Sequence, residues 1–240
     1  MRKLVLVAAM LGLASQCWAG SARRNAVDRL NNAAKVLHEI MDAPDQRIPD
    51  EIMERAKCVA VIPHLVKGGF VFGAEHGKGV ATCRTAEGWS APAFIKIAGG
   101  SWGTQIGAEA VDLVMVIKSE KGMQKLLSSK FEIGRDASVA LGPVGRHSSE
   151  STDLKLDVII LTYSRAKGAF VGFTFKGALV RADNQSRRAI YGRRVTTRAT
   201  LLGRVAAPAA AGPFLDAVRG AKAQAMAQAR KCAVSESVHA

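Results

Sequence analysis

The chain has 240 residues and a net charge of +14, with 48% hydrophobic but only 5% aromatic residues. This length suits one large domain or two small ones. The charge favours an anionic partner, such as acidic lipid or acidic protein. So few aromatic residues supply a base-stacking surface poorly, and we therefore expect no nucleic-acid partner.

Residues 1–19 have the pattern of a cleavable signal peptide. Arg2 and Lys3 give a positive start, an apolar run covers Leu4–Ala14, and the small residues Cys17 and Ala19 precede the expected cut. We expect cleavage after Ala19 and a periplasmic or secreted protein, peripheral to a membrane. The alternative is a lipoprotein anchored at Cys17, against which the neighbouring Gln16 argues.

An amphipathic helix is predicted over Ala22–Met41. Apolar residues recur there every three or four positions, and charged residues occupy the other side. The apolar residues are Ala26, Leu30, Ala33, Leu37 and Ile40. Pro49 then starts a second, shorter helix that runs to about Ala56.

From Cys58 onward, short β-branched and aromatic runs alternate with glycines, which predicts strands. The expected strands are Cys58–Ile62, Gly69–Glu75, Val80–Arg84, Ala93–Ala98, Gly103–Gly107, Val111–Lys118, Lys130–Ile133, Ser138–Leu141, Lys155–Tyr163 and Ala169–Arg181. A short helix over Glu120–Ser128 interrupts them. We expect an antiparallel, glycine-rich β core, either a sandwich or barrel-like.

The C-terminal part is predicted to be helical again. Short helices are expected over Asn184–Tyr191 and Thr197–Leu202, and an Ala-rich helix over Pro213–Arg230. The fold class is therefore α+β. We expect a signal peptide over 1–19, one domain over 22–202, and a linker with the Ala-rich helix over 203–240.

Enzyme and metal patterns are weak in this sequence. Gly99–Gly103 matches the five-letter nucleophile-elbow pattern around Ser101, but the surroundings favour strand rather than the strand–turn–helix that the motif needs. A zinc site from Cys58, His64, His76 and Cys83 lacks a closely spaced ligand pair. We therefore expect no enzyme, no metal and no cofactor.

Three cysteines remain after the expected cleavage, namely Cys58, Cys83 and Cys232. Cys58 and Cys83 lie in strand-like runs, and an exported protein permits a disulfide between them. The alternative is three small buried or tail residues, because connectivity cannot be deduced from the sequence.

The motifs together resemble the SYLF domain, also called the Ysc-type lipid-binding or actin-binding domain. The resemblance covers about residues 26–202, in a fixed order of blocks. They are Ala34–Leu37, Ala56–Pro63, Lys67–Phe70, Trp89–Phe94, Gly99–Gly107, Asp112–Val114, Gly134–Ala140, Gly142–Arg146, Tyr163–Gly168, Phe170–Gly172, Gly177 and Tyr191–Gly192.

The resemblance implies a non-enzymatic domain that binds phosphoinositides or other acidic membrane lipids, and in some members actin. By matching position, the implied lipid-binding residues are Lys35 in the first helix, Lys67 and Arg165, and Arg146 follows a matching block. Lys167 is a further candidate, because it lies among the cations near glycine-rich turns. The helix either docks on the membrane or packs on the β core. Because we expect export, we expect an anionic phospholipid surface as the partner and not actin.

Two alternatives remain open at this stage. One is a structural or interaction protein of the envelope that binds an acidic protein or polysaccharide. The other is a serine hydrolase that uses Ser101. The sequence leaves the lipid and the oligomeric state undetermined.

Overall fold

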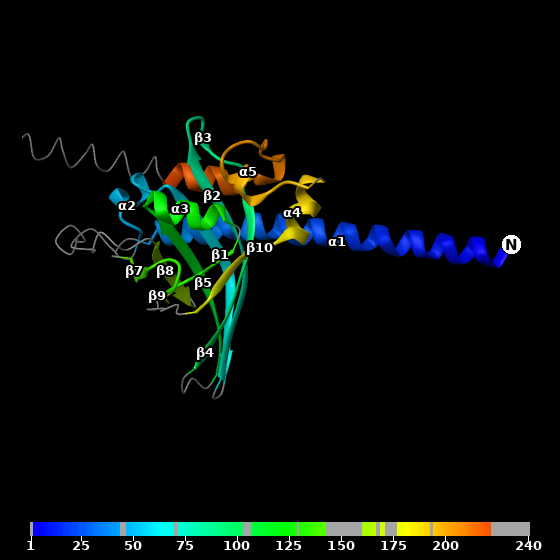
Figure 1. Cartoon of the computed structure of the whole chain (residues 1–240), viewed down its shortest axis with the longest axis horizontal. Coiled ribbons are helices and arrows are strands. Elements are labelled where there is room, and N and C mark those ends of the chain that lie inside the picture. The colour runs from blue at the N-terminus through cyan, green and yellow to red at the C-terminus, as the bar shows by residue number, and fades with distance from the viewer. Residues whose placement is uncertain are drawn as a thin grey trace, which may run out of the picture.

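The described part of this computed structural model covers most of the chain. It comprises residues 2–43, 47–69, 72–102, 107–128, 130–142, 160–166, 169–170, 177–192 and 194–221. Figure 1 shows a long first helix, a strongly curled sheet and shorter helices packed around it.

The helices lie at both ends of the described chain, with one inserted between strands. They are α1 (Arg2–Met41), α2 (Asp50–Glu54), α3 (Glu120–Leu127), α4 (Asn184–Tyr191), α5 (Thr197–Leu201) and the 3-10 helix η1 (Ala209–Ala211). A further helical stretch covers residues 212–221.

The described strands form one ten-stranded sheet. They are β1 (Cys58–Gly69), β2 (Phe72–Thr85), β3 (Gly88–Trp89), β4 (Ala93–Trp102), β5 (Gly107–Ile117), β6 (Lys130–Glu132), β7 (Val139–Leu141), β8 (Ile160–Ala166), β9 (Ala169–Phe170) and β10 (Leu179–Ala182).

The sheet has the order β6-β10-β4-β2-β1-β5-β8-β7, with β3 beside β2 and β9 beside β8. The α+β class is confirmed, and one pair of strands departs from the expected antiparallel core. β7 runs parallel to β8, with Val139 opposite Ile160 and Leu141 opposite Thr162. A parallel pair needs a long connection, and 18 residues separate Leu141 from Ile160 in the numbering of the chain.

Strand bounds differ from the sequence prediction mainly around the glycines. We expected separate strands over Cys58–Ile62 and Gly69–Glu75, whereas β1 runs through to Gly69 and β2 begins at Phe72. Glycine signals turns in a sequence, but here glycines lie inside paired strands. A side chain at Gly77 would bring its Cβ within 2.6 Å of Leu65 Cδ1, so this glycine permits close packing of β2 on β1.

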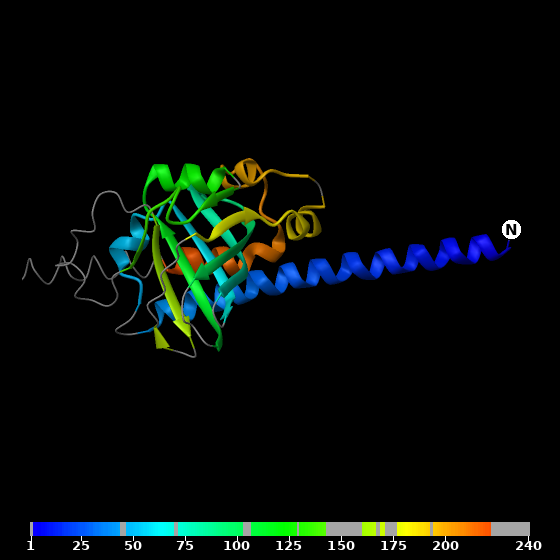
Figure 2. The same cartoon turned by 60° about the horizontal axis from the view of Figure 1, so that its bottom comes forward.

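The two faces of the sheet carry separate apolar clusters. Val61, Val80 and Phe94 pack with α1 on one face. Ile62, Ile95 and Val180 pack on the other face, together with Leu126 of α3 and Leu201 of α5, and residues alternate between the two faces along each strand. Figure 2 shows α1 on one side of the sheet and α3 with α5 on the other.

From Ala26 to Met41, the apolar side of α1 is buried by this packing. Leu30, Leu37 and Ile40 are each 0% exposed and belong to the same cluster as Val61 and Phe94. The predicted amphipathic helix therefore exists, and its apolar side is buried in the core of the domain. Burial of such side chains stabilises the fold by about 1.5–3 kcal/mol each.

Residues beyond 202 also contribute to this core. Phe214 and Val218 are buried in the cluster that contains α1, and Val205, within the expected linker, is buried as well. The domain boundary at residue 202 stays a prediction, and side chains on both sides of it share one core.

Local capping explains where several helices begin and end. The side chain of Ser119 accepts a hydrogen bond from the Gly122 amide at the start of α3, and Asp183 does the same for Ser186 at the start of α4. Gly192 ends α4 in the left-handed conformation that glycine adopts without strain. No helix in the described part of the chain combines the length and apolarity needed to cross a bilayer.

Candidate anion-binding surface

Lys35 and Arg165, two of the predicted lipid-binding residues, meet at one carboxylate. Lys35 Nζ lies 3.7 Å from Glu39 Oε1, one turn further along α1. Arg165 Nη1, on β8, donates to Glu39 Oε2 at 3.0 Å. Glu39 therefore offsets part of the positive charge of both residues and ties α1 to the sheet.

The other three predicted residues are not placed. Arg146 and Lys167 lie outside the described residues. Lys67 lies in β1 opposite Glu75 of β2 and Glu109 of β5, but its side chain is outside the description. Whether Lys67, Arg146, Arg165 and Lys167 converge on one face stays a prediction.

A row of four cations crosses four neighbouring strands. Lys78 of β2 is directly opposite Lys96 of β4, and Lys96 is directly opposite Arg181 of β10. Arg181 is in turn opposite Lys130 of β6. Directly opposed residues project from the same face of a sheet. We call these four residues, Lys78, Lys96, Arg181 and Lys130, the basic row.

The basic row lies on the α1 face of the sheet. Val80 and Phe94 are each two residues from a member of the row, so they share its face, and both pack with α1. Lys78, Arg181 and Lys130 are exposed, and Lys96 is half-buried. With strands about 4.8 Å apart, the row extends over roughly 14 Å.

Like charges directly opposite each other destabilise a sheet. None of the four side chains forms a salt bridge within the described part of the chain. An arrangement that repels itself in the free protein is favourable when an anionic partner neutralises it. The basic row is therefore the strongest candidate for binding an anionic surface.

A buried ion pair holds α1 beside this row. Arg29 Nη1 donates to Asp183 Oδ2 at 2.9 Å, and the two side chains are 9% and 6% exposed. The Arg29 guanidinium also lies over the Phe94 ring, 5.7 Å from its centroid. Burial raises the pKa of Asp183, but hydrogen bonds from Ser186 and Arg29, and the charge of Arg29, outweigh burial and keep this pKa below its ordinary value.

Sequence reasoning missed the basic row because it depends on strand register. Lys78, Lys96, Lys130 and Arg181 are separated by up to 103 positions and share no local motif. The one available signal was the alternation Gly77-Lys78-Gly79, a single cation between two residues that allow close packing.

The residues of the serine-hydrolase and zinc-site alternatives all lie within strands of the sheet. Ser101 lies within β4, opposite Gly73 of β2, and not at a turn from strand to helix. Cys58 and Cys83 are directly opposed in β1 and β2 and are joined in a disulfide, so they cannot serve as zinc ligands with His64 and His76. No group of three metal-ligating side chains occurs among the described residues.

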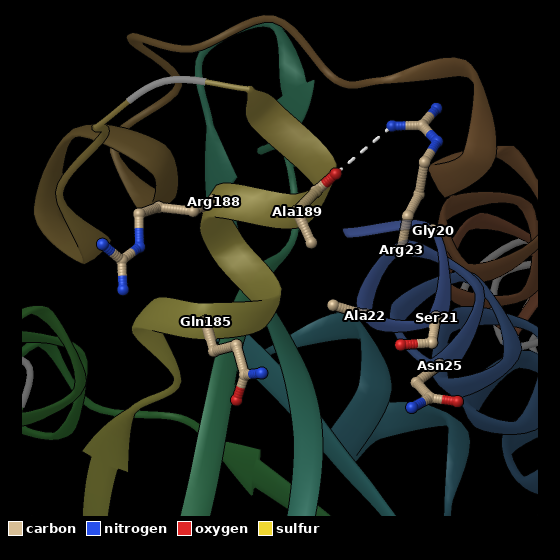
Figure 3. Close-up of a pocket in the computed structure, with 8 residues that line it drawn as sticks. All are labelled: Gly20, Ser21, Ala22, Arg23, Asn25, Gln185, Arg188 and Ala189. Atoms are coloured by element: carbon tan, nitrogen blue, oxygen red, sulfur yellow. Dashed lines mark hydrogen bonds between the residues drawn. The ribbon is translucent and has the colours of Figure 1, made fainter. Parts of the chain in front are cut away.

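A pocket of about 830 Å³ opens between residues 20–25 of α1 and residues 185–189 of α4. Figure 3 shows Gln185 on α4 and Asn25 on α1, on the two helices that line the pocket, and Arg188 extending away from α1. Arg23 Nη1 donates to the Ala189 carbonyl oxygen at 3.3 Å. Because this guanidinium already contacts a backbone carbonyl, the basic row is a stronger candidate for binding an anion than this pocket.

Comparison with known proteins identifies relatives over most of the chain. Residues 98–221 match the sequence model of a family described as "Ysc84: Las17-binding protein actin regulator". The chain is 32% identical over 201 residues to Protein YSC84 of Saccharomyces cerevisiae, covering 80% of this chain and 43% of that protein. It is 30% identical over 200 residues to LAS seventeen-binding protein 3 of the same yeast, with the same coverage.

An animal relative gives the same picture. The chain is 30% identical over 194 residues to the SH3 domain-containing YSC84-like protein 1 of Rattus norvegicus. The match covers 78% of this chain and 57% of the rat protein. The chain thus spans about half the length of the curated relatives it matches.

Proposed function

This chain belongs to the Ysc84 family of Las17-binding protein actin regulators, which confirms the SYLF resemblance, and on this premise we propose that it is a non-enzymatic domain that binds membranes containing anionic phospholipid. The family description names binding and regulation and no reaction. Because the match covers 43% of the yeast relatives, their own partners are not carried over to this chain.

The basic row is the single observation that carries this proposal. Four cations lie side by side on one face of the sheet and complement the negative charges of a membrane surface, which are spread over a plane. Each Lys or Arg near an anionic leaflet contributes about 1 kcal/mol. The row therefore supplies roughly 4 kcal/mol of attraction, enough for reversible, peripheral binding.

The proposed binding is electrostatic and does not use the apolar side of α1. Insertion of that side into a bilayer would require Leu30, Leu37 and Ile40 to leave the core of the domain, where they are completely buried. Attraction between exposed charges is screened by salt over about 8–10 Å. The proposed binding should therefore weaken steeply as ionic strength rises.

We place this activity in the cell envelope, after export. The positive, apolar and small-residue segments of residues 1–19 support export. Figure 1 shows the first part of α1 extending away from the sheet, so its removal would leave the packed part of the helix in place. Envelope lipids such as phosphatidylglycerol or cardiolipin would then supply the anionic surface.

Vesicle flotation tests the proposal. Purified protein should float with phosphatidylglycerol-containing vesicles at low salt, remain behind with pure phosphatidylcholine vesicles, and dissociate as salt is added. Equal flotation with both vesicle types, or flotation that salt does not change, would refute the electrostatic mechanism.

An acidic protein is the second candidate partner, because the family description names a protein partner, Las17. The same basic row would serve such a partner by charge complementarity. A partner that is captured without vesicles, and that blocks vesicle flotation when added in excess, would favour this alternative.

A further inference from the structure

A second, smaller pocket opens where the basic row meets α1. Its volume is about 340 Å³, within the size range of small-molecule sites. The strand side of the pocket carries His64, Val66, His76 and Lys78, and the α1 side carries Asn25, Asp28, Arg29 and Asn32. Lys78 is also the member of the basic row at its β2 end, so the pocket adjoins the proposed membrane-binding surface.

The two sides of the pocket differ in chemistry. The strand side has one ammonium group and two imidazoles, which are donors suited to a phosphate. The α1 side has two carboxamides and the Asp28 carboxylate, which can accept hydrogen bonds from hydroxyl groups. The charge of Arg29 is balanced by Asp183, at 2.9 Å.

His64 is held on the rim of this pocket by an unusual backbone. Pro63 and His64 together stand opposite the single residue Asp112 of β5, which makes a β-bulge in β1. His64 has a φ of 51°, and it is the one non-glycine residue with positive φ in the described part of the chain. Its amide donates to Asp112 Oδ1 at 2.9 Å, which fixes this conformation.

Such backbone conformations are costly and recur at ligand-binding sites. Glycine would adopt this conformation without strain, whereas the sequence places an exposed imidazole there. Val66, on the same rim, is 49% exposed, and this apolar surface suits the carbon skeleton of a small ligand.

We propose that this pocket binds one phosphorylated polyol, such as a glycerol phosphate headgroup, with its phosphate toward His64, His76 and Lys78 and its hydroxyl groups toward Asn25, Asp28 and Asn32. The inference deepens the proposed function and rests on it for the source of the ligand: the basic row attracts the membrane, and the pocket selects a headgroup. A free polyol phosphate has the same chemistry.

The test titrates purified protein with glycerol 3-phosphate, inorganic phosphate and glycerol, and monitors the histidine ring signals by NMR. We expect glycerol 3-phosphate to bind most tightly and to shift the signals of His64 and His76 but not those of His38. His76→Ala and His64→Gly should each weaken this binding by about tenfold, the loss of one phosphate contact. Asp28→Asn together with Asn32→Ala should weaken glycerol 3-phosphate but not inorganic phosphate.

The variants are chosen so that folding does not obscure the result. His64→Gly keeps the positive φ at no steric cost, and His38→Ala removes an exposed histidine outside the pocket. No binding of glycerol 3-phosphate, or binding that His64→Gly and His76→Ala leave unchanged, would overturn the inference. Equal affinity for inorganic phosphate and glycerol 3-phosphate would overturn the polyol assignment.

Vesicle flotation of the same variants separates this inference from the proposed function. Lys96→Gln should weaken flotation and leave glycerol 3-phosphate binding intact, because Lys96 belongs to the row and not to the pocket. Flotation without any headgroup binding refutes the headgroup inference and leaves the membrane-binding proposal in place. Headgroup binding without flotation refutes the membrane as the source and supports a free polyol phosphate as the ligand.

Discussion

Lys78 and Lys96 lie directly opposite each other on β2 and β4, on the face of the sheet where α1 packs. A sheet selected for stability alone would place opposite charges or uncharged residues at such a pair. The repulsion is doubled at Lys96, which also faces Arg181. We interpret these destabilising like-charge pairs as a sign that the basic row is a binding surface.

Replacing Lys96 by Thr should stabilise the free protein while it weakens vesicle binding. The change removes two like-charge pairs and introduces a residue favoured in strands, so we expect a gain of about 0.2–1 kcal/mol in the free energy of unfolding. Urea unfolding measures the gain. The control is Lys121→Gln, which should change stability little. Glutamine is used there because Lys121 lies in the helix α3, where threonine is less favourable. A loss of stability in Lys96→Thr would show that the row does not repel itself.

Breaking the Arg29–Asp183 pair should be strongly destabilising. Either Arg29→Ala or Asp183→Asn leaves a buried group without its charged partner, which costs about 3–5 kcal/mol. Chemical unfolding of each single variant and of the double variant measures the coupling. Additive losses would mean that the two residues contribute independently.

The same pair predicts a pH dependence. Burial raises the pKa of Asp183, but its hydrogen bonds to Ser186 and Arg29 and the Arg29 charge bring it below the ordinary value of 3.8. A carboxyl with a lowered pKa stabilises the folded state above its unfolded pKa, and this contribution is lost as pH falls through the folded pKa. The stability difference between wild type and Asp183→Asn should therefore be constant at neutral pH and shrink below about pH 4. A difference that grows in acid would contradict this assignment.

Glu39→Gln should strengthen binding to anionic vesicles. Glu39 contacts both Lys35 and Arg165, so its neutralisation leaves two cations without their carboxylate. Flotation at a series of salt concentrations measures the gain. Glu51→Gln on α2 is a matched control for net charge, because Glu51 is exposed and forms no salt bridge within the described part of the chain. Equal gains in both variants would attribute the effect to net charge rather than to Lys35 and Arg165.

Much of the fold was predictable from the sequence because local patterns determine it. The apolar spacing from Ala26 to Ile40 predicted the packed side of α1, and the bounds of α3 and α4 agree with their caps at Ser119 and Asp183. The parallel β7–β8 pair and the full lengths of β1 and β2 were missed. Strand pairing depends on contacts between residues far apart in the chain, which no local pattern encodes.

The candidate site was less predictable for the same reason. The family motifs pointed to Lys35 and Arg165, which the fold brings to Glu39, where their charge is partly offset. The basic row and the strained His64 depend on register and on a bulge opposite Asp112, neither of which is visible in one sequence.

Removing the disulfide should lower stability without changing the fold. Cys58 and Cys83 are joined across β1 and β2 with a sequence separation of 25, and linking a loop of this size stabilises a protein by about 2–4 kcal/mol. Urea unfolding of Cys58→Ala/Cys83→Ala, compared with wild type with and without reductant, measures the loss. If reductant does not change the urea unfolding of the wild type, the disulfide is not formed in the protein tested.

The most direct test of the membrane-binding proposal compares two double variants with the same loss of charge. Lys96→Gln/Arg181→Gln removes the centre of the basic row, and Lys121→Gln/Arg198→Gln removes exposed cations from α3 and α5, which pack on the opposite face. We predict that the first variant binds phosphatidylglycerol vesicles about thirtyfold more weakly than wild type, from the loss of about 2 kcal/mol, while the second binds almost as well as wild type. Equal weakening in both variants would contradict a defined binding face.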